Sequence, residues 1–162
     1  MNYRYANIND VDLILFFIRQ LAEYENMENE VVATTELLKE WLFEKKVAEV
    51  IFAVEKEKEV GFALFFHNFS TFLGKAGIYL EDLFVLPEFR GKGHGKNLLK
   101  ILSRIAVERG CGRVEWCCLD WNKPSIDFYK SFGAVPMDDW TIYRLTGENL
   151  TFRANNLCLF CT

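Results

Sequence analysis

The chain has 162 residues, of which 51% are hydrophobic, and it carries a formal net charge of −4 at pH 7. This length suits one folded domain with a sizeable core, and the apolar content excludes an intrinsically disordered chain. A net negative charge argues against a nucleic-acid partner and is compatible with a small cationic ligand. The sequence contains neither an apolar run long enough to span a membrane nor a signal-peptide pattern at its start. We therefore expect a single domain over residues 1–162 with no membrane partner.

The cysteines indicate the cellular compartment. Their number, five, is odd and most of them have apolar neighbours, which is typical of a reducing environment and predicts a cytoplasmic protein. Cys158 and Cys161 have the spacing of a metal-binding or redox pair, but no second pair of ligands and no histidine lies near them in the sequence. We therefore expect no bound metal.

Hydrophobic periodicity predicts a short strand and two helices in the first part of the chain. After a strand at 3–6, Asn9 is expected to cap a helix that has one apolar face and ends near Tyr24. Thr35 is expected to cap a second helix that runs to Phe43.

Three strands follow. Apolar runs at 50–55 and 60–69, separated by a charged turn, predict a pair of neighbouring strands. After a loop at 70–77, the run 78–86 is apolar or aromatic except for two adjacent acids. Pro87 ends this run, because proline has no N–H to donate to a sheet. We interpret the run as a central strand.

A glycine-rich turn joins the central strand to a helix. The turn, Arg90-Gly91-Lys92-Gly93-His94-Gly95, contains three glycines, and from Lys96 onward apolar residues recur at helical spacing. Glycines let a backbone approach a ligand closely, and the first amides of a helix lack intrahelical acceptors, so the turn can bind phosphate oxygens. It also fits a solvated basic loop. Its spacing matches neither a P-loop, GxxxxGK[ST], nor the dinucleotide fingerprint GxGxxG.

The last third of the chain adds two strands and a helix to the prediction. Gly110 marks the end of the helix after the turn, and a strand is expected at 113–119. Asn122 starts a short helix that ends at Gly133, and a last strand is expected at 140–145. The resulting order of elements, βααβββαβαβ, predicts an α/β domain with a mixed sheet.

Three motifs together resemble one family. The turn 90–95 matches the pattern [RQ]-x-x-G-x-[GA], Tyr79-Leu80-Glu81-Asp82 precedes it, and Trp121-Asn-Lys-Pro-Ser-Ile-Asp-Phe-Tyr-Lys130 follows it. They resemble the GNAT superfamily of N-acetyltransferases, and within it the diamine (spermidine/spermine) acetyltransferases including the thialysine-type enzymes, from Tyr3 to about Leu150. The resemblance implies a GNAT fold, in which a mixed, mostly antiparallel central sheet is splayed between its fourth and fifth strands and flanked by helices.

The resemblance implies acetyl-CoA as the cosubstrate. The turn would hold its pyrophosphate, and backbone groups of the splayed strand would contact the pantetheine arm and the thioester carbonyl. The side chain of Asn122 would also contact CoA, although a helix-capping role explains this residue equally well. The residues implied to bind acetyl-CoA are Leu83, Phe84, Val85, Arg90, Gly91, Lys92, Gly93, His94, Gly95, Lys96, Asn122 and Tyr129. The histidine side chain in this set is interpreted as incidental, because the family tolerates several residues there.

Acetyl transfer to an amine requires that the amine lose its proton, because an ammonium group has no lone pair. Glu81 is the candidate proton acceptor: it interrupts an apolar strand, and partial burial would raise the pKa of its carboxyl group toward the useful range. It aligns with the carboxylate that the resembled enzymes use, directly or through a water; a buried ion pair or a sheet-edge acid would also explain it. Asp82 faces the opposite side in a regular strand. A β-bulge of the kind found in GNAT folds would turn both acids toward one site, where Asp82 would anchor the amine.

Tyr129 matches the family tyrosine that protonates the departing thiolate, so the resemblance implies that it is a catalytic acid. On the residues alone, Tyr129 is equally an ordinary core aromatic at helical spacing beside Phe128 and Phe132.

Four carboxylates within 23–30 form an acidic segment, which fits either a solvated loop or a rim that attracts a cation. In the resembled enzymes this loop borders the amine site. Trp121 and Trp140 are candidates either to line the amine site or to pack the core, and Asp138 or Asp139 is a weak match to a further family acid. The residues implied to bind the substrate are Tyr24, Glu25, Glu28, Glu81 and Asp82.

We therefore expect an acetyl-CoA-dependent N-acetyltransferase. Its substrate would be the primary amine of a small cationic molecule, a diamine, a polyamine or a lysine-like amino acid, which attacks directly in a ternary complex. The resemblance also implies a homodimer. Two alternatives remain: acetylation of an unrelated amine, such as a peptide N-terminus or an antibiotic, and a non-catalytic acyl-CoA sensor. The presence of both Glu81 and Tyr129 disfavours the sensor.

Overall fold

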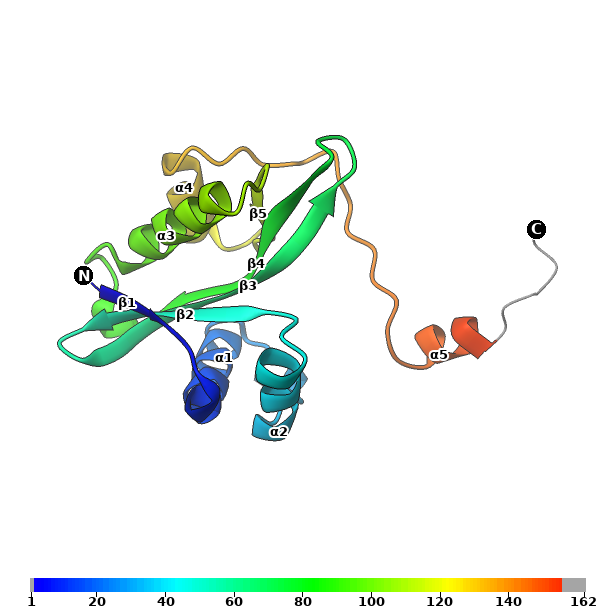
Figure 1. Cartoon of the computed structure of the whole chain (residues 1–162), viewed down its shortest axis with the longest axis horizontal. Coiled ribbons are helices and arrows are strands. Elements are labelled where there is room, and N and C mark those ends of the chain that lie inside the picture. Colours follow the sequence, from blue (N-terminus) through cyan, green and yellow to red (C-terminus); the bar gives the residue numbers. More distant parts are fainter. Residues whose placement is uncertain (1, 156–162) are drawn as a thin grey trace. The chain divides into compact units, whose positions relative to one another are not determined.

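The computed structural model describes residues 2–155, and their fold is built on a five-stranded sheet in the order β1-β2-β3-β4-β5 (Figure 1). Neighbouring strands from β1 to β4 are antiparallel, and β5 pairs with β4 in parallel. This confirms the prediction of an α/β fold on a mixed, mostly antiparallel sheet. The strands are β1 (Asn2–Tyr5), β2 (Glu49–Glu55), β3 (Lys58–Ser70), β4 (Lys75–Val85) and β5 (Val114–Trp116).

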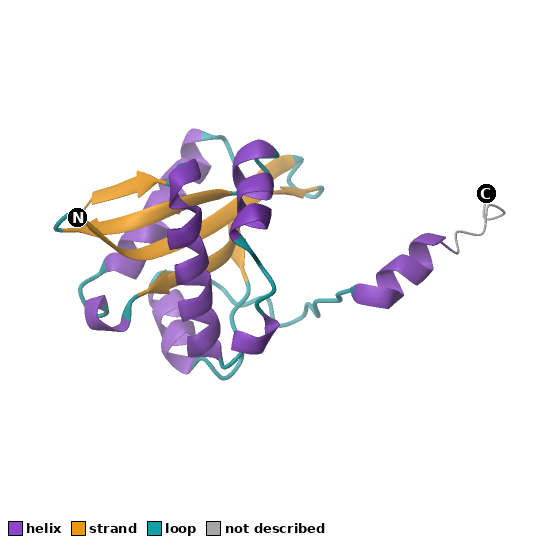
Figure 2. Ribbon diagram, turned by 90° about the horizontal axis from the view of Figure 1, so that it is seen from below, coloured by secondary structure: helices purple, strands orange, loops and turns teal. Residues whose placement is uncertain are grey.

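The chain divides into two compact units, one up to Trp121 and one from Asn122 onward. The first unit contains the sheet, and helices cover both of its faces (Figures 1 and 2). On one face lie α1 (Val11–Glu25) and α2 (Thr35–Leu38), which continues as a π-helical turn at Lys39–Glu44. On the other face lies α3 (His94–Glu108).

Aromatic side chains fill the space between α1 and the sheet. Phe17 stacks on Phe62, with ring centroids 5.2 Å apart, and lies 5.8 Å from Phe52; all three residues are completely buried. Burial of one such side chain contributes about 2–3 kcal/mol. This layer therefore holds α1 firmly against the sheet and fixes the position of its C-terminal end.

The side-chain caps of the N-terminal helical segments differ from the predicted ones. Asn7, rather than Asn9, caps the 3-10 turn Ile8–Asp10 that leads into α1, whose own N-cap residue makes no side-chain cap hydrogen bond. Thr34, rather than Thr35, accepts the amide hydrogen of Leu37 at the start of α2. A capping residue needs an extended backbone. Asn7 and Thr34 have it, with φ of −126° and −120°, whereas the two predicted caps already belong to helical turns.

A β-bulge interrupts the pairing of β3 with β4. Leu64 pairs with Asp82 and the next residue of β3 pairs with Leu80, so Glu81 is an extra residue without a β3 partner. The pairing of β4 with β5 stops at the same place, because its last pair joins Leu80 and Trp116. The predicted splay is thus confirmed. Within the described chain, the final part of β4 has no strand on its β5 side.

Several boundaries differ from the prediction. Strand β4 begins at Lys75, inside the loop predicted at 70–77, and β5 ends at Trp116 rather than at Leu119. The predicted end of α3 is confirmed, since Gly110 adopts the left-handed conformation (φ 69°) just beyond it.

The described part of the second unit, residues 122–155, contains two helices, α4 (Lys123–Ser131) and α5 (Gly147–Asn155). The helix predicted to start at Asn122 is confirmed as α4. The strand predicted at 140–145 is wrong: this stretch forms no strand in the part of the chain that the structure describes, and Tyr143 is 92% exposed. The residues at 140–145 favour a strand locally, but a strand also requires a neighbouring ladder of hydrogen bonds. Cys158 and Cys161 lie outside the described residues.

Candidate active site

The start of α3 is built to accept an anion. Gly91 and Gly93 adopt left-handed backbone conformations, with φ of 75° and 86°, and Gly93 is the N-cap of the helix. Gly93 has no side chain, and no described side chain caps this helix start. The amides of His94, Gly95 and Lys96 therefore lie at the positive end of the helix dipole without intrahelical acceptors, which is the arrangement that binds phosphate oxygens.

The cationic side chains of the turn contact neighbouring elements. Nε of Arg90 donates a hydrogen bond to the carbonyl oxygen of Val85 (2.9 Å), and its guanidinium lies 4.7 Å above the ring of Tyr24. Lys92 lies 3.4 Å from a carboxylate oxygen of Glu55. These contacts hold the two cations beside the turn, where they add to the positive charge of the helix start.

His94 contacts the sheet through its side chain. Its side chain is only 2% exposed, and its Nε2 lies 2.7 Å from Oε2 of Glu55, the last residue of β2. The imidazole is thus directed into the protein, and only the backbone amide of His94 remains to contact a phosphate.

The splayed end of β4 exposes backbone groups at alternate residues. The amide of Leu86 donates to Val60 on β3 (2.9 Å), and the carbonyl of Phe84 lies against Gly61 on β3. Because the hydrogen-bonding groups of an antiparallel strand alternate between its two sides, those of Leu83 and Val85 face the side that β5 leaves open. Of the three predicted positions on this strand, Leu83 and the amide of Val85 face the open side, because the carbonyl oxygen of Val85 already accepts a hydrogen bond from Arg90.

Of the two adjacent carboxyl groups, that of Asp82 is the more buried, although it keeps partial exposure. Burial, together with the negative charges of Glu81 and Glu25, raises the pKa of Asp82 to about 7. Glu81 is exposed, so the expectation of its partial burial is wrong. Burial also raises the pKa of Glu25. We refer to Glu25, Glu81 and Asp82 as the acidic cluster; it joins the C-terminal end of α1 to the β4 bulge.

Aromatic rings and a cysteine adjoin the acidic cluster. The ring of Tyr24 lies 6.3 Å from that of Phe84 and 6.1 Å from that of Trp121. Burial raises the pKa of the Cys118 thiol, as does the nearby charge of Glu25. The end of α1, the bulge of β4 and the segment after β5 therefore converge in the first unit. The sequence analysis did not identify Cys118 as part of the site. It placed this residue in the strand predicted at 113–119, whereas β5 ends at Trp116.

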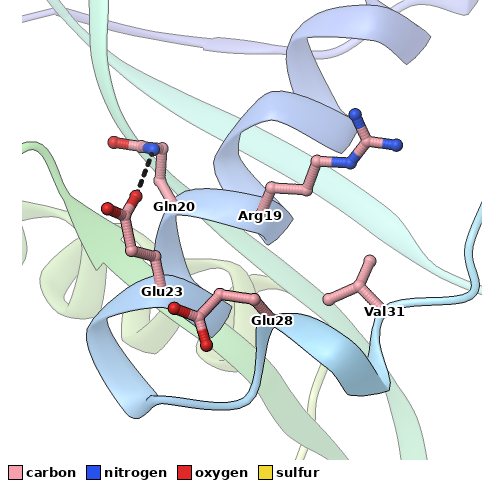
Figure 3. Close-up of a pocket in the computed structure, with 5 residues that line it drawn as sticks. All are labelled: Arg19, Gln20, Glu23, Glu28 and Val31. Carbon is pink, nitrogen blue, oxygen red and sulfur yellow. Dashed lines mark hydrogen bonds between the residues drawn. The ribbon is translucent and has the colours of Figure 1, made fainter.

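Glu28 lines a pocket of about 360 Å³ together with Arg19, Gln20, Glu23 and Val31, none of which belongs to the acidic cluster. Figure 3 shows these side chains around the C-terminal half of α1 and the turn that follows it. Of the predicted substrate-binding residues, the structure thus groups Tyr24, Glu25, Glu81 and Asp82.

The second unit carries the two remaining predicted residues. The side chain of Asn122 accepts a hydrogen bond from the amide of Ser125 (3.3 Å), which confirms its role as the cap of α4. Tyr129 lies in the middle of α4, and its ring centroid is 5.3 Å from that of Phe128.

Two further properties concern the whole described part of the chain. Nowhere in residues 2–155 do three histidine, cysteine, aspartate or glutamate side chains gather in a way that could hold a metal ion. None of the helices in this range is both long and apolar enough to span a membrane.

The uncapped, glycine-rich helix start, the bulged and splayed β4 and the mixed sheet are together typical of the acetyltransferase fold. The model of the acetyltransferase (GNAT) family matches residues 15–134, and the chain belongs to this family. Its members use acetyl-CoA as the acetyl donor.

Several relatives are named N-acetyltransferases. The chain is 36% identical over 157 residues to thialysine N-epsilon-acetyltransferase from Bos taurus, a match covering 90% of this chain and 92% of the bovine one. It is 48% identical over 90 residues to L-ornithine N5-acetyltransferase NATA1 from Arabidopsis thaliana, covering 56% of this chain and 40% of the plant protein. Among solved structures, an integron cassette protein from the mobile metagenome of V. cholerae matches with a TM-score of 0.79 at 31% identity, covering 94% of this chain and 96% of that one.

Proposed function

We propose that this N-acetyltransferase transfers the acetyl group of acetyl-CoA to a primary amine of a small cationic substrate, either a diamine or polyamine or a lysine-like amino acid. The observation that carries the proposal is the acidic cluster beside the ring of Tyr24. Arg90 places a guanidinium over this ring, which indicates that the ring accepts a cation there. The bovine and Arabidopsis relatives are named for thialysine and ornithine, amino acids that carry a terminal amine.

Binding of the donor rests mainly on backbone groups. The amides from Gly91 to Lys96 would hold the pyrophosphate, and the open groups of Leu83 and Val85 would bind the pantetheine arm. Arg90, Lys92 and Lys96 add positive charge that favours the anionic donor. The side chain of Asn122 is a further candidate contact.

The carboxylates of the bulge would prepare the amine. A primary amine is largely protonated at neutral pH, so a proton acceptor is required before attack. We assign this role to Glu81, directly or through a water, and assign the anchoring of the ammonium to Asp82 and Glu25. The pKa of about 7 for Asp82 makes this residue the second candidate acceptor, because a general base works best when its pKa lies near the operating pH.

The amine nitrogen would attack the thioester carbon directly in a ternary complex. The C–N bond forms as the C–S bond breaks, and Tyr129 would give its phenolic proton to the departing sulfur. Holding both reactants in one site contributes several kcal/mol through proximity alone. We further propose that the chain is one acetyltransferase domain, because the family match, 15–134, extends from the first unit into the second. We also propose that the protein forms a homodimer and that it is located in the cytoplasm.

A panel of amines tests this function. The protein is incubated with acetyl-CoA and, separately, lysine, ornithine, thialysine, putrescine, spermidine, a peptide with a free N-terminus and an aminoglycoside, and thiol release is followed with a thiol-reactive dye. We expect turnover with at least one of the first five amines. Turnover with the peptide or the aminoglycoside alone would support the alternative substrates. Binding of CoA without turnover of any amine would support a sensor.

A further inference from the structure

One carboxylate outside the predicted site contacts two residues of the phosphate-accepting turn. Glu55, at the C-terminal end of β2, lies 2.7 Å from Nε2 of His94 through one oxygen and 3.4 Å from Nζ of Lys92 through the other. His94 is the first residue of α3, and Lys92 immediately precedes its N-cap. Glu55 therefore connects the sheet to the start of the helix.

The contact with His94 is the stronger constraint. The imidazole is 2% exposed, and a buried polar group without a hydrogen-bond partner destabilises the structure. Because the carboxylate accepts, Nε2 of His94 is the donor. The hydrogen bond to His94 is also the main reason why the pKa of Glu55 lies below its ordinary value. Glu55 is thus ionised whenever the pair is formed at neutral pH.

We propose that Glu55 is a positioning residue for the acetyl donor: through His94 it fixes the first turn of α3, so that the amides at the helix start remain directed at the pyrophosphate. This inference rests on the proposed function, because it assigns a role toward the donor of that reaction. The inference concerns the contact between Glu55 and His94, and it assigns no role to either side chain in binding the substrate amine.

Electrostatics alone predicts the opposite effect for Glu55. A carboxylate beside a site for a polyanion repels it, and Glu55 also engages Lys92, a cation of the same turn. If charge were its only influence, neutralising Glu55 would strengthen the binding of CoA. If it positions the turn, neutralising it weakens binding. The sign of the change therefore distinguishes the two roles.

The experiment measures the binding of CoA to the full chain by titration calorimetry. Glu55→Ala removes the acceptor and Glu55→Gln keeps a neutral one. Glu57→Gln is the charge-matched control, because Glu57 is exposed in the turn that follows β2. We expect Kd to rise about tenfold in E55A and about threefold in E55Q, which corresponds to the loss or weakening of one charge-assisted hydrogen bond. E57Q is expected to bind CoA as tightly as the wild type or more tightly.

Steady-state kinetics separate positioning from a general structural role. The KM for acetyl-CoA is expected to rise in E55A and E55Q by the same factors as Kd, while kcat at saturating acetyl-CoA and the KM for the amine stay unchanged. If E55A does not fold, as judged by circular dichroism, the comparison of E55Q with E57Q carries the test with the same signs.

The outcomes of these experiments distinguish failure of this inference from failure of the proposed function on which it rests. Equal or tighter binding of CoA to the folded Glu55 variants overturns the positioning role and leaves the proposed function standing. A fall in kcat at unchanged KM for acetyl-CoA also overturns it. Failure of the wild type to bind CoA overturns the proposed function and, with it, this inference.

Discussion

Asp82, at the β4 bulge, and Glu25, the last residue of α1, belong to one acidic site. Burial, the charge of Glu81 and the charge of Glu25 together raise the pKa of Asp82 to about 7. Each carboxylate makes ionisation of the other less favourable, so the cluster is best stabilised when a cation joins it. This is the electrostatic condition that a cationic amine substrate satisfies.

The stability of the fold is expected to depend on the ionisation of Asp82. Its pKa in the folded state, about 7, lies above the ordinary value of 3.8. The stabilisation linked to the protonated form is therefore complete below pH 4 and is lost as the pH rises through 7. Asp82→Asn removes the ionisable carboxyl group, so the variant does not lose this stabilisation as the pH rises. Because Asp82 keeps some contact with solvent, we expect the free energy of unfolding of D82N to exceed that of the wild type by about 2 kcal/mol at pH 8.5.

Urea unfolding of the wild type and D82N at pH 5 and pH 8.5 measures this difference. Asp138→Asn is the control, because Asp138 is exposed in the second unit and its replacement is expected to have an effect that does not change with pH. A difference between D82N and the wild type that is the same at both pH values would show that Asp82 ionises normally.

The pH dependence of the rate identifies the proton acceptor. If Glu81 accepts the proton, Glu81→Gln lowers kcat/KM about 100-fold. The loss is largest at low pH, where the unprotonated amine is scarcest. Asp82→Asn then mainly raises the KM for the amine. If Asp82 is the acceptor, the two variants exchange these effects. A kcat that changes less than about threefold in both variants would exclude both carboxylates from this step.

The local features of the fold could be predicted from the sequence, because local signals define them. The proline after β4, the glycines at 91–95 and the helical spacing that follows located the helix start. The bulge at the two adjacent acids was expected from the family resemblance and not from the residues themselves. Their unequal burial could not be predicted, because it depends on which residues of β3 pair with Leu80 and Asp82.

The sequence analysis did not predict contacts between side chains that are far apart in the chain. Glu55 and His94 are 39 residues apart in the chain, and in the sequence Glu55 is only the last residue of a strand beside a charged turn. The strand predicted at 140–145 was wrong for a related reason: the preference of residues for a strand is a local property, whereas the ladder of hydrogen bonds that makes a strand is not.

The left-handed conformation of Gly93 is expected to matter for the donor. Gly93→Ala places a side chain at φ 86°, which destabilises the fold by about 1 kcal/mol. It also adds a methyl group where phosphate oxygens must approach the backbone. We expect the KM for acetyl-CoA to rise at least about tenfold in G93A. Gly74→Ala is the matched control, since Gly74 has φ 62° in the β3–β4 turn and open space around it. It should lose similar stability with an unchanged KM; equal effects on KM in the two variants would contradict a role of Gly93 in binding.

The phenol of Tyr129 is expected to act on the leaving thiolate and not on the binding of the donor. Tyr129→Phe keeps the ring, and with it the packing against Phe128 (5.3 Å), but removes the proton that the sulfur would receive. We expect kcat to fall about 100-fold in Y129F, with the Kd for CoA within about twofold of the wild type. Tyr143→Phe, at an exposed position of the same unit, should leave both quantities unchanged. Calorimetry supplies Kd, and single-turnover thiol release supplies the rate of the chemical step. An unchanged single-turnover rate in Y129F would assign the proton to another donor, and a parallel loss of CoA affinity would make Tyr129 a binding residue instead.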